Sequence, residues 1–271
     1  SLSGRPLTCV DVLGNKHTTE YDTVGRPLSY EHDTVKATFA YNSLSQLVRV
    51  NAQDKSTGRT LITLLEYDDL GRETSRHFQL EDRPTRVLTS SYTLAGKLAR
   101  KRLAEASSVM RDEGFTYDSR GRLEHYVCSG SECPRDPYGK EIRSQRYTFD
   151  ALDNILTLTT EFPGGSNVAS YTYDGDDPTR LIEIRHSHKD YPAPALLLYD
   201  VNGRLIKDEQ SRSLTYDGFG RLTRVASAVG ELIRGYHYDA TDQLIALSQA
   251  KGAPVQRFYR DGRVINEVRG E

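Results

Sequence analysis

Two pairs of residues, one of histidines and one of cysteines, each lie close together in the sequence and could each supply two ligands to a metal ion. His186 and His188 flank one serine, so a strand there would place both imidazoles on one face. A zinc site needs further ligands, and no cysteine accompanies these histidines. Cys128 and Cys133 are separated by four residues rich in Gly and Ser, and no second pair follows. We expect no metal at either pair, and a local disulfide stays open as an alternative for the cysteines.

The acidic segment Asp174-Gly175-Asp176-Asp177 offers the carboxylate oxygens that calcium prefers. It lacks the spacing of an EF-hand loop and the closing glutamate, which favours a solvated turn. The glycines are dispersed along the chain, so no phosphate-binding loop is formed, and no Gly-x-Ser-x-Gly nucleophile motif occurs. The sequence therefore predicts a protein that is not an enzyme and binds no cofactor.

Charge and length exclude several other classes of protein. The 271 residues suffice for one large domain or two ordinary ones, and the net charge is −2, with 36 basic and 38 acidic residues intermixed. The sequence lacks the basic stripe that would indicate nucleic-acid binding. It also lacks an apolar run of about 18 residues, which would indicate a membrane-spanning helix. The segment from Ser1 to Leu13 does not resemble a signal peptide. Three cysteines do not make a disulfide framework.

The aromatic composition indicates how the chain packs. It contains 17 Tyr, 7 Phe and no Trp. Tyrosine has an apolar ring and a polar tip, so it suits surfaces that are only half dry. We therefore expect thin, partly solvated layers rather than a thick core.

An internal repeat positions these residues. The pattern Tyr-Asp-x-x-Gly-Arg occurs in five clear copies. Weaker copies begin at Tyr41, Tyr92, Phe149, Tyr173, Tyr238 and Tyr259. The shortest spacing between copies is 17 residues, from Tyr199 to Tyr216, and the longest is 32, from Tyr117 to Phe149. The predicted structural signature consists of Tyr21, Asp22, Gly25, Arg26, Tyr67, Asp68, Gly71, Arg72, Tyr117, Asp118, Gly121, Arg122, Tyr199, Asp200, Gly203, Arg204, Tyr216, Asp217, Gly220 and Arg221.

Each copy predicts a short hairpin turn. The fourth residue after the aromatic is Gly in six copies, and Ser45, Asp153, Asp177 or Asp242 in four others. Glycine adopts positive φ freely, and aspartate does so more readily than most residues. An Asp at the start of the turn can accept a hydrogen bond from the backbone two residues on. The pattern thus predicts a type I turn closed by a residue in the left-handed conformation. The Arg or Lys that follows this residue is expected to pair with the turn Asp.

Strands are expected on both sides of each turn. Tyr171 and Tyr173 alternate along the chain, as do Tyr236 and Tyr238, which places each pair on one face of a strand. Residues 94–110 also have near-helical spacing, but they stay in register with the repeat, so we predict strands there. The segments 127–143 and 175–194 interrupt the rhythm and contain several prolines, and we expect both to be long loops.

The copies cover nearly the whole chain, so residues 1–271 are predicted to form a single repeat array without a separate catalytic domain. The segment Ser3-Gly4-Arg5-Pro6-Leu7 resembles the second half of a copy, as in Gly25-Arg26-Pro27-Leu28. We therefore expect the sequence to be an excerpt of a longer array.

Tyr-Asp-x-x-Gly-Arg-Leu in series resembles the RHS/YD-repeat superfamily over about residues 3 to 268. That superfamily includes bacterial polymorphic toxins, the C component of insecticidal toxin complexes and the animal teneurins. The resemblance implies an all-β fold, an antiparallel hairpin array whose sheet curves and spirals into a hollow shell. In the bacterial members such a shell encloses a C-terminal toxin domain.

The resemblance also implies a setting and partners. The segment from Phe258 to Glu267 is similar to strands of bacterial toxin-complex C proteins, which favours a bacterial protein that is exported or associated with the cell surface. Expected partners are the remaining repeats, the enclosed toxin domain and a delivery-complex protein or glycan. Asp136-Pro137-Tyr138-Gly139 is superficially similar to the family's self-cleaving core, but repeats follow it, so we expect an ordinary turn.

Two functions compete at this stage. The first is a non-catalytic wall segment of an encapsulating shell. The second is a cell-surface module that uses exposed Tyr and Arg to bind carbohydrate or protein. In either case an isolated array would present unpaired strand edges, so we predict that it self-associates.

Overall fold

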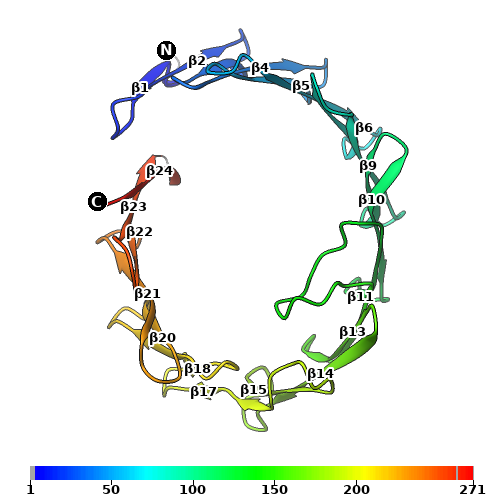
Figure 1. Ribbon diagram of the computed structural model, residues 1–271, viewed down its shortest axis with the longest axis vertical. Helices are drawn as coiled ribbons and strands as arrows, with labels where there is room; N and C mark the ends of the chain where they lie inside the picture. The colour runs from blue at the N-terminus through cyan, green and yellow to red at the C-terminus, as the bar shows by residue number, and fades with distance from the viewer. Residues whose placement is uncertain (1–3, 261, 271) are drawn as a thin grey trace. The chain divides into compact units, whose positions relative to one another are not determined.

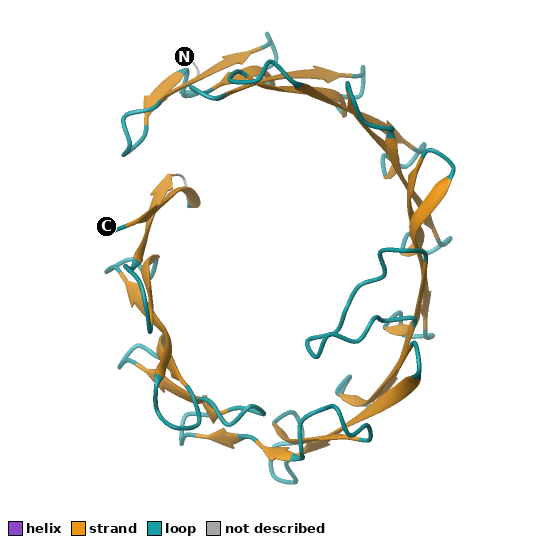
Figure 2. Cartoon of the chain, in the orientation of Figure 1, coloured by secondary structure: helices purple, strands orange, loops and turns teal. Residues whose placement is uncertain are grey.

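A computed structural model describes residues 4–260 and 262–270 of the chain. Every regular element of this part is a β-strand, and none of these residues is helical (Figure 2). The part described accordingly offers no helix long and apolar enough to span a membrane. Ser3 and Asp261, which belong to two predicted copies of the repeat, lie outside the described residues. The predicted all-β class is confirmed.

The chain divides into two units. The first comprises residues up to Asp136 together with Glu141–Ser144, and the second comprises Pro137–Lys140 and the residues from Gln145 onward. The strands that begin before residue 130 are β1 (Thr8–Val10), β2 (Lys16–Tyr21), β3 (Pro27–Glu31), β4 (Val35–Tyr41), β5 (Leu47–Asp54), β6 (Thr60–Tyr67), β7 (Glu73–Leu80), β8 (Arg86–Tyr92), β9 (Leu98–Glu105), β10 (Ser108–Tyr117) and β11 (Leu123–Ser129). The later strands are β12 (Ser144–Phe149), β13 (Ile155–Phe162), β14 (Gly165–Tyr173), β15 (Leu181–His186), β16 (Ala195–Leu196), β17 (Leu198–Tyr199), β18 (Leu205–Lys207), β19 (Ser213–Tyr216), β20 (Leu222–Ala226), β21 (Leu232–Tyr238), β22 (Leu244–Gln249), β23 (Val255–Arg260) and β24 (Arg263–Arg269).

Strand order follows sequence order (Figure 1). In the first unit β1 to β11 pair in succession, and each strand runs antiparallel to the next, as in the pairing of β6 with β7 and of β8 with β9. In the second unit β12 to β16 pair in succession, and β17 to β24 form an eight-stranded sheet. Every second turn of such a meander lies on the same side of its sheet, at the same end of the strands. The Tyr-Asp turns are alternate turns, so within each sheet they all lie on one side.

The repeat turn has the predicted geometry. The Oδ1 atom of Asp22 accepts hydrogen bonds from the backbone N–H groups of Val24 (3.0 Å) and Arg26 (2.8 Å). The N–H of Gly25 donates to the carbonyl of Asp22 at 3.0 Å, and Gly25 has a φ of 88°. The strand register shifts between Glu20 and Tyr21, which marks the bulge expected beside a left-handed closing residue.

Three non-glycine residues adopt positive φ at the same turn position: Ser45 (64°), Asp153 (70°) and Asp242 (64°). The prediction for Asp177 is wrong. In that copy the N–H of Asp174 donates to the carbonyl of Arg180, six residues on instead of four, and Asp177 is not among the residues with positive φ. Two additional residues lengthen this turn, so the closing position no longer falls on Asp177.

The array has little dry core. Figure 1 shows each unit as one layer of strands, and no large side chain among the described residues is more than 98% buried. The main buried cluster of the first unit is formed by Tyr126, Cys128, Cys133 and Ile142. The expectation of thin, half-solvated layers is confirmed.

The two long loops predicted from sequence are shorter in the structure. Strand β11 continues to Ser129, so the first loop begins at Gly130, and the N–H of Cys128 donates to the carbonyl of Arg143 at 2.8 Å. The segment 175–194 is not one loop, because it contains β15. Its prolines lie on either side of this strand, where no ladder hydrogen bond is lost. The choice of strands for residues 94–110 is confirmed by β9 and β10.

Candidate functional site

The repeat tyrosines form a series of contacts between neighbouring repeats, which we call the tyrosine ladder. Tyr92, at the end of β8, donates its hydroxyl to the carbonyl oxygen of Glu73 at 2.7 Å. Glu73 is the first residue after the preceding Tyr-Asp turn. The same bond, 2.7 to 3.1 Å long, joins Tyr21 to Pro6, Tyr41 to Pro27, Tyr67 to Leu47, Tyr117 to Leu98, Tyr173 to Ile155, Tyr199 to Leu181, Tyr216 to Leu205, Tyr238 to Leu222 and Tyr259 to Leu244.

A basic side chain from the preceding turn covers the ring of most ladder tyrosines. The guanidinium carbon of Arg72 lies 4.5 Å from the centre of the Tyr92 ring. This distance suits a cation–π interaction. The other pairs, at 4.6 to 5.9 Å, are Arg26 on Tyr41, Lys97 on Tyr117, Arg5 on Tyr21, Arg180 on Tyr199, Arg204 on Tyr216 and Arg221 on Tyr238.

Arginines at this turn position also bind the aspartate of their own turn. In each of the five clear copies the Nε atom of Arg donates to the Oδ2 atom of Asp at 2.6 to 2.7 Å, in the pairs Asp22–Arg26, Asp68–Arg72, Asp118–Arg122, Asp200–Arg204 and Asp217–Arg221. The hydrogen bond from Arg72 lowers the pKa of Asp68. The glycines of these copies, at 25, 71, 121, 203 and 220, all have positive φ. The structure thus brings Asp, Gly and Arg together within one turn and adds the Tyr of the next copy.

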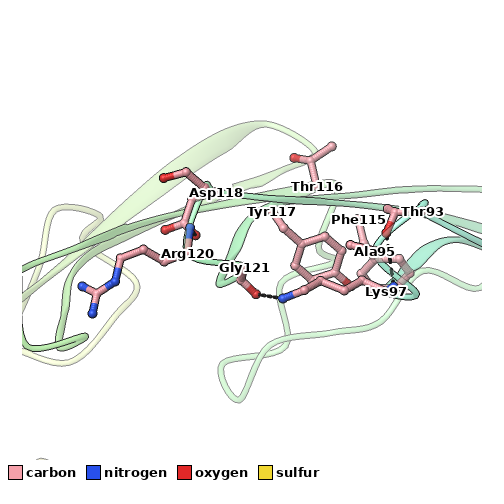
Figure 3. A pocket seen from close by; sticks show the side chains of 10 residues that line it. Thr93, Ala95, Lys97, Phe115, Thr116, Tyr117, Asp118, Arg120 and Gly121 are labelled. Carbon is pink, nitrogen blue, oxygen red and sulfur yellow. Dashed lines mark hydrogen bonds between the residues drawn. The ribbon is translucent and has the colours of Figure 1, made fainter.

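A shallow pocket of about 490 Å³ lies between two successive turns of the first unit (Figure 3). Lys97 and Tyr117 line it, and the ammonium group of Lys97 donates to the carbonyl oxygen of Gly121. Thr93 takes the place of the turn aspartate in this copy, so Lys97 reaches the next turn instead. The pocket is a groove of the ladder, and its side chains serve the contacts between repeats.

The histidines at 186 and 188 belong to an aromatic cluster of the second unit. The centre of the His186 ring lies 5.1 Å from that of Tyr191, and the ring of His188 lies 5.3 Å from that of Phe162. The amide of Asn167 lies 3.0 Å from Nδ1 of His186. Among the described residues neither histidine joins a group of three metal-ligating side chains.

The cysteine pair packs in a buried cluster, and the acidic segment forms a turn held by its own hydrogen bonds. Cys128 and Cys133 are free thiols in the buried cluster of the first unit, and burial together with a hydrogen bond to Cys128 raises the pKa of Cys133 to about 12. Asp174 accepts backbone hydrogen bonds from Asp176 and pairs with Arg180 at 2.5 Å. This carboxylate therefore organises its own turn.

Sequence reasoning missed several turns that lack the tyrosine. Two turns on the opposite side of their sheets, at the other end of the strands, have the same backbone hydrogen bonds as the Tyr-Asp turns. They are Asp11 to Asn15 and Asp208 to Arg212. The signal in these two turns is the Asp-x-x-Gly or Asp-x-x-Ser pattern alone, without the tyrosine that marks the repeat. A spatial group of Asp11, His17 and His32 was also missed, because it forms only when the strands pair.

The comparisons with known proteins agree with this architecture. Two curated relatives, tRNA nuclease WapA of Bacillus subtilis (strain 168) and tRNA3(Ser)-specific nuclease WapA of Bacillus spizizenii, are each 24% identical to this chain over 226 residues. The match covers 82% of this chain and 8% of each relative. The chain therefore spans less than a tenth of the length of either.

A solved structure of the Photorhabdus luminescens Tc holotoxin pore superimposes with a TM-score of 0.63 at 16% identity, covering 94% of this chain and 14% of that chain. At this identity the likeness concerns the fold. The family model described as Teneurin YD-shell matches residues 53–268, which is most of the sequence. The chain is a member of the Teneurin YD-shell family.

Proposed function

We propose that residues 1–271 form one stretch of wall in the shell of a longer toxin-type protein, a shell that encloses a C-terminal toxin domain. The observation that carries the proposal is the tyrosine ladder, which links successive repeats within each unit through the tyrosine hydroxyls, while the copy at Phe149 lacks this hydroxyl. Such an array gains its stability from neighbour contacts and can be extended by adding repeats. The chain covers 14% of the matched chain of the toxin pore, which is consistent with one part of a larger wall.

The proposed role of this segment is not catalytic. The signature residues Tyr, Asp, Gly and Arg are engaged with one another in turns and ladder contacts. The two curated relatives are named as tRNA nucleases, and this chain spans 8% of each. We propose that an activity of that kind, in a parent of this chain, would reside outside the repeats, so that the array holds no separate catalytic domain.

A binding module for carbohydrate or protein is the competing function. Sugar stacking needs open aromatic faces, but the ladder rings of Tyr41, Tyr92 and Tyr117 are covered by Arg26, Arg72 and Lys97. This arrangement favours the shell. The setting we propose is a bacterial protein that is exported or held at the cell surface, whose partners are its own further repeats, the enclosed domain and a delivery-complex protein.

Limited proteolysis of the full-length parent tests the proposal. The domain beyond residue 271 is compared within the parent and expressed alone, under the same protease and at the same concentration. We expect the domain to be protected in the parent and cut rapidly when alone. Equal cleavage rates would show that the array does not enclose it, and the binding function would then take precedence.

A further inference from the structure

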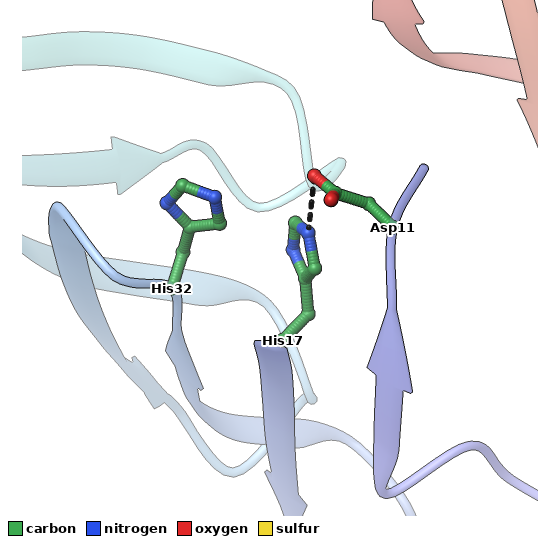
Figure 4. A group of neighbouring side chains, drawn as sticks. All are labelled: Asp11, His17 and His32. Carbon is green, nitrogen blue, oxygen red and sulfur yellow. Dashed lines mark hydrogen bonds and ion pairs between the residues drawn. The ribbon is translucent and has the colours of Figure 1, made fainter. Parts of the chain in front are cut away.

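Three potential metal ligands converge at the start of the first unit (Figure 4). Asp11 begins the turn between β1 and β2, His17 lies on β2, and His32 follows β3. The ligand atoms of the three side chains all lie within 4.8 Å of one another. The residues are six and fifteen positions apart along the chain, so only the antiparallel pairing of these strands brings them together.

We propose that Asp11, His17 and His32 bind a zinc ion. Two imidazoles and one carboxylate are a ligand set that zinc accepts, with a fourth position left for water. Two ligand atoms bound to one tetrahedral zinc lie roughly 3.4 Å apart, given bond lengths of about 2.0–2.1 Å. The Nε2 atom of His17 lies 3.2 Å from Oδ2 of Asp11, which matches that separation.

Neighbouring groups orient all three ligands. Nδ1 of His17 lies 2.5 Å from the hydroxyl of Tyr30, which directs Nε2 toward Asp11. Nδ1 of His32 lies 3.2 Å from Oγ1 of Thr34 and 3.3 Å from the backbone N–H of Thr34. Zinc on Nε2 would place the ring proton on Nδ1, where Oγ1 of Thr34 can accept it. Such contacts to the second nitrogen fix the ring orientation and tautomer of metal-binding histidines.

The carboxylate is fixed in a similar way. Oδ1 of Asp11 accepts hydrogen bonds from the backbone N–H groups of Leu13 and Asn15, both at 2.9 Å, so Oδ2 faces His17. The side chain is only 2% exposed. In the clear repeats an arginine donates to this oxygen, but here the position is Asn15, whose neutral amide leaves the negative charge in place. A buried carboxylate beside two imidazoles is an environment that favours a cation.

The simpler explanation is an ion pair between Asp11 and a protonated His17, in which His32 has no part. Zinc titration of the purified chain, after treatment with a chelator, separates the two. The variants are Asp11→Asn, His17→Gln and His32→Gln, and His237→Gln on β21 is the matched control. Asn42 begins a regular turn in this chain, so Asp11→Asn is expected to keep the turn.

We expect the wild-type chain to bind one zinc ion, measured by calorimetry and by competition with a chromogenic chelator, and to melt at a higher temperature with zinc than without. Each of the three variants should lose at least tenfold in affinity, of the order seen when metal sites are perturbed, and the control should not. Melting without zinc confirms that each variant is folded. Binding that His32→Gln leaves unchanged, or that all variants share, would overturn the proposal, and neither result bears on whether the array encloses a domain.

Discussion

The guanidinium of Arg72 lies over the ring of Tyr92, with 4.5 Å between its central carbon and the ring centre. The hydroxyl of Tyr92 binds the carbonyl of Glu73, the residue next to that arginine. One turn therefore holds the tyrosine of the next repeat by its face and by its tip. A register slip of one residue would move every side chain to the opposite face of its strand, so this double contact specifies the register from one repeat to the next.

Removal of a ladder hydroxyl should weaken the array. Tyr238 donates to the carbonyl of Leu222 at 3.0 Å, and the substitution Tyr238→Phe removes this bond while keeping the ring. We expect a loss of about 0.5–1.5 kcal/mol in the free energy of unfolding, measured by urea denaturation. Tyr236→Phe, two residues earlier on β21, is the control, since no hydrogen bond of its hydroxyl is present in the described part of the chain. Equal effects of the two substitutions would contradict a specific role for the ladder.

The basic side chain of the turn should contribute through the ring that it covers. Arg72→Gln keeps a polar side chain, and glutamine occurs naturally at the equivalent position of another copy, Gln46. The cation–π contact with Tyr92 should account for about 0.5–1 kcal/mol of the loss in the free energy of unfolding, and the variant also loses the hydrogen bond from Arg72 to Asp68. The control is Arg83→Gln, since Arg83 is exposed in the turn between β7 and β8, on the side of the sheet opposite the Tyr-Asp turns. The expectation fails if the two variants have the same denaturation midpoint.

The left-handed turn position gives a sharper test. Gly220 has a φ of 82°, and a Cβ atom there would meet no neighbour closer than 4.0 Å, so a substitution acts through the backbone alone. We expect Gly220→Val to lower the free energy of unfolding by about 1–3 kcal/mol. Gly218, two residues earlier in the same turn, has no positive φ and open space around it. Gly218→Val should therefore have a much smaller effect, and a comparable loss at both positions would show that strain at positive φ is not the cause.

The turns could be predicted from sequence because their information is local. Asp22 and Gly25 are three residues apart, and their hydrogen bonds close within the same five-residue segment. The failure at Asp177 has the same origin, because two inserted residues change the turn without changing the Tyr-Asp pair that identifies it.

The ladder was beyond sequence reasoning, since it joins residues about twenty positions apart whose contact depends on strand register. Tyr92 and Glu73, for instance, meet only because β7, β8 and β9 pair as they do. The group of Asp11, His17 and His32 needs the same long-range information. A repeat pattern reveals which residues recur, but the pairing of strands decides which of them touch.

Acid should destabilise the array through its turn aspartates. A hydrogen bond from Arg72 lowers the pKa of Asp68, a backbone hydrogen bond from Arg204 lowers that of Asp200, and bonds from Ser56 lower the pKa of Asp54 to about 2. A carboxyl whose pKa is lower in the folded chain than in the unfolded chain, where it is about 3.9, stabilises the fold above that value. This stabilisation is lost as the pH falls through the folded pKa.

We therefore expect the urea midpoint to stay level down to about pH 5 and to fall between about pH 4 and pH 2. Asp200→Asn is the informative variant, because asparagine already begins the turn at Asn42 and can accept the same backbone hydrogen bonds. Its midpoint should be lower than that of the wild type at pH 7 and should decline less steeply in acid, since one titrating carboxylate is gone. A midpoint that stays constant to pH 2, or a variant with the wild-type slope, would show that the turn aspartates do not set the acid sensitivity of the array.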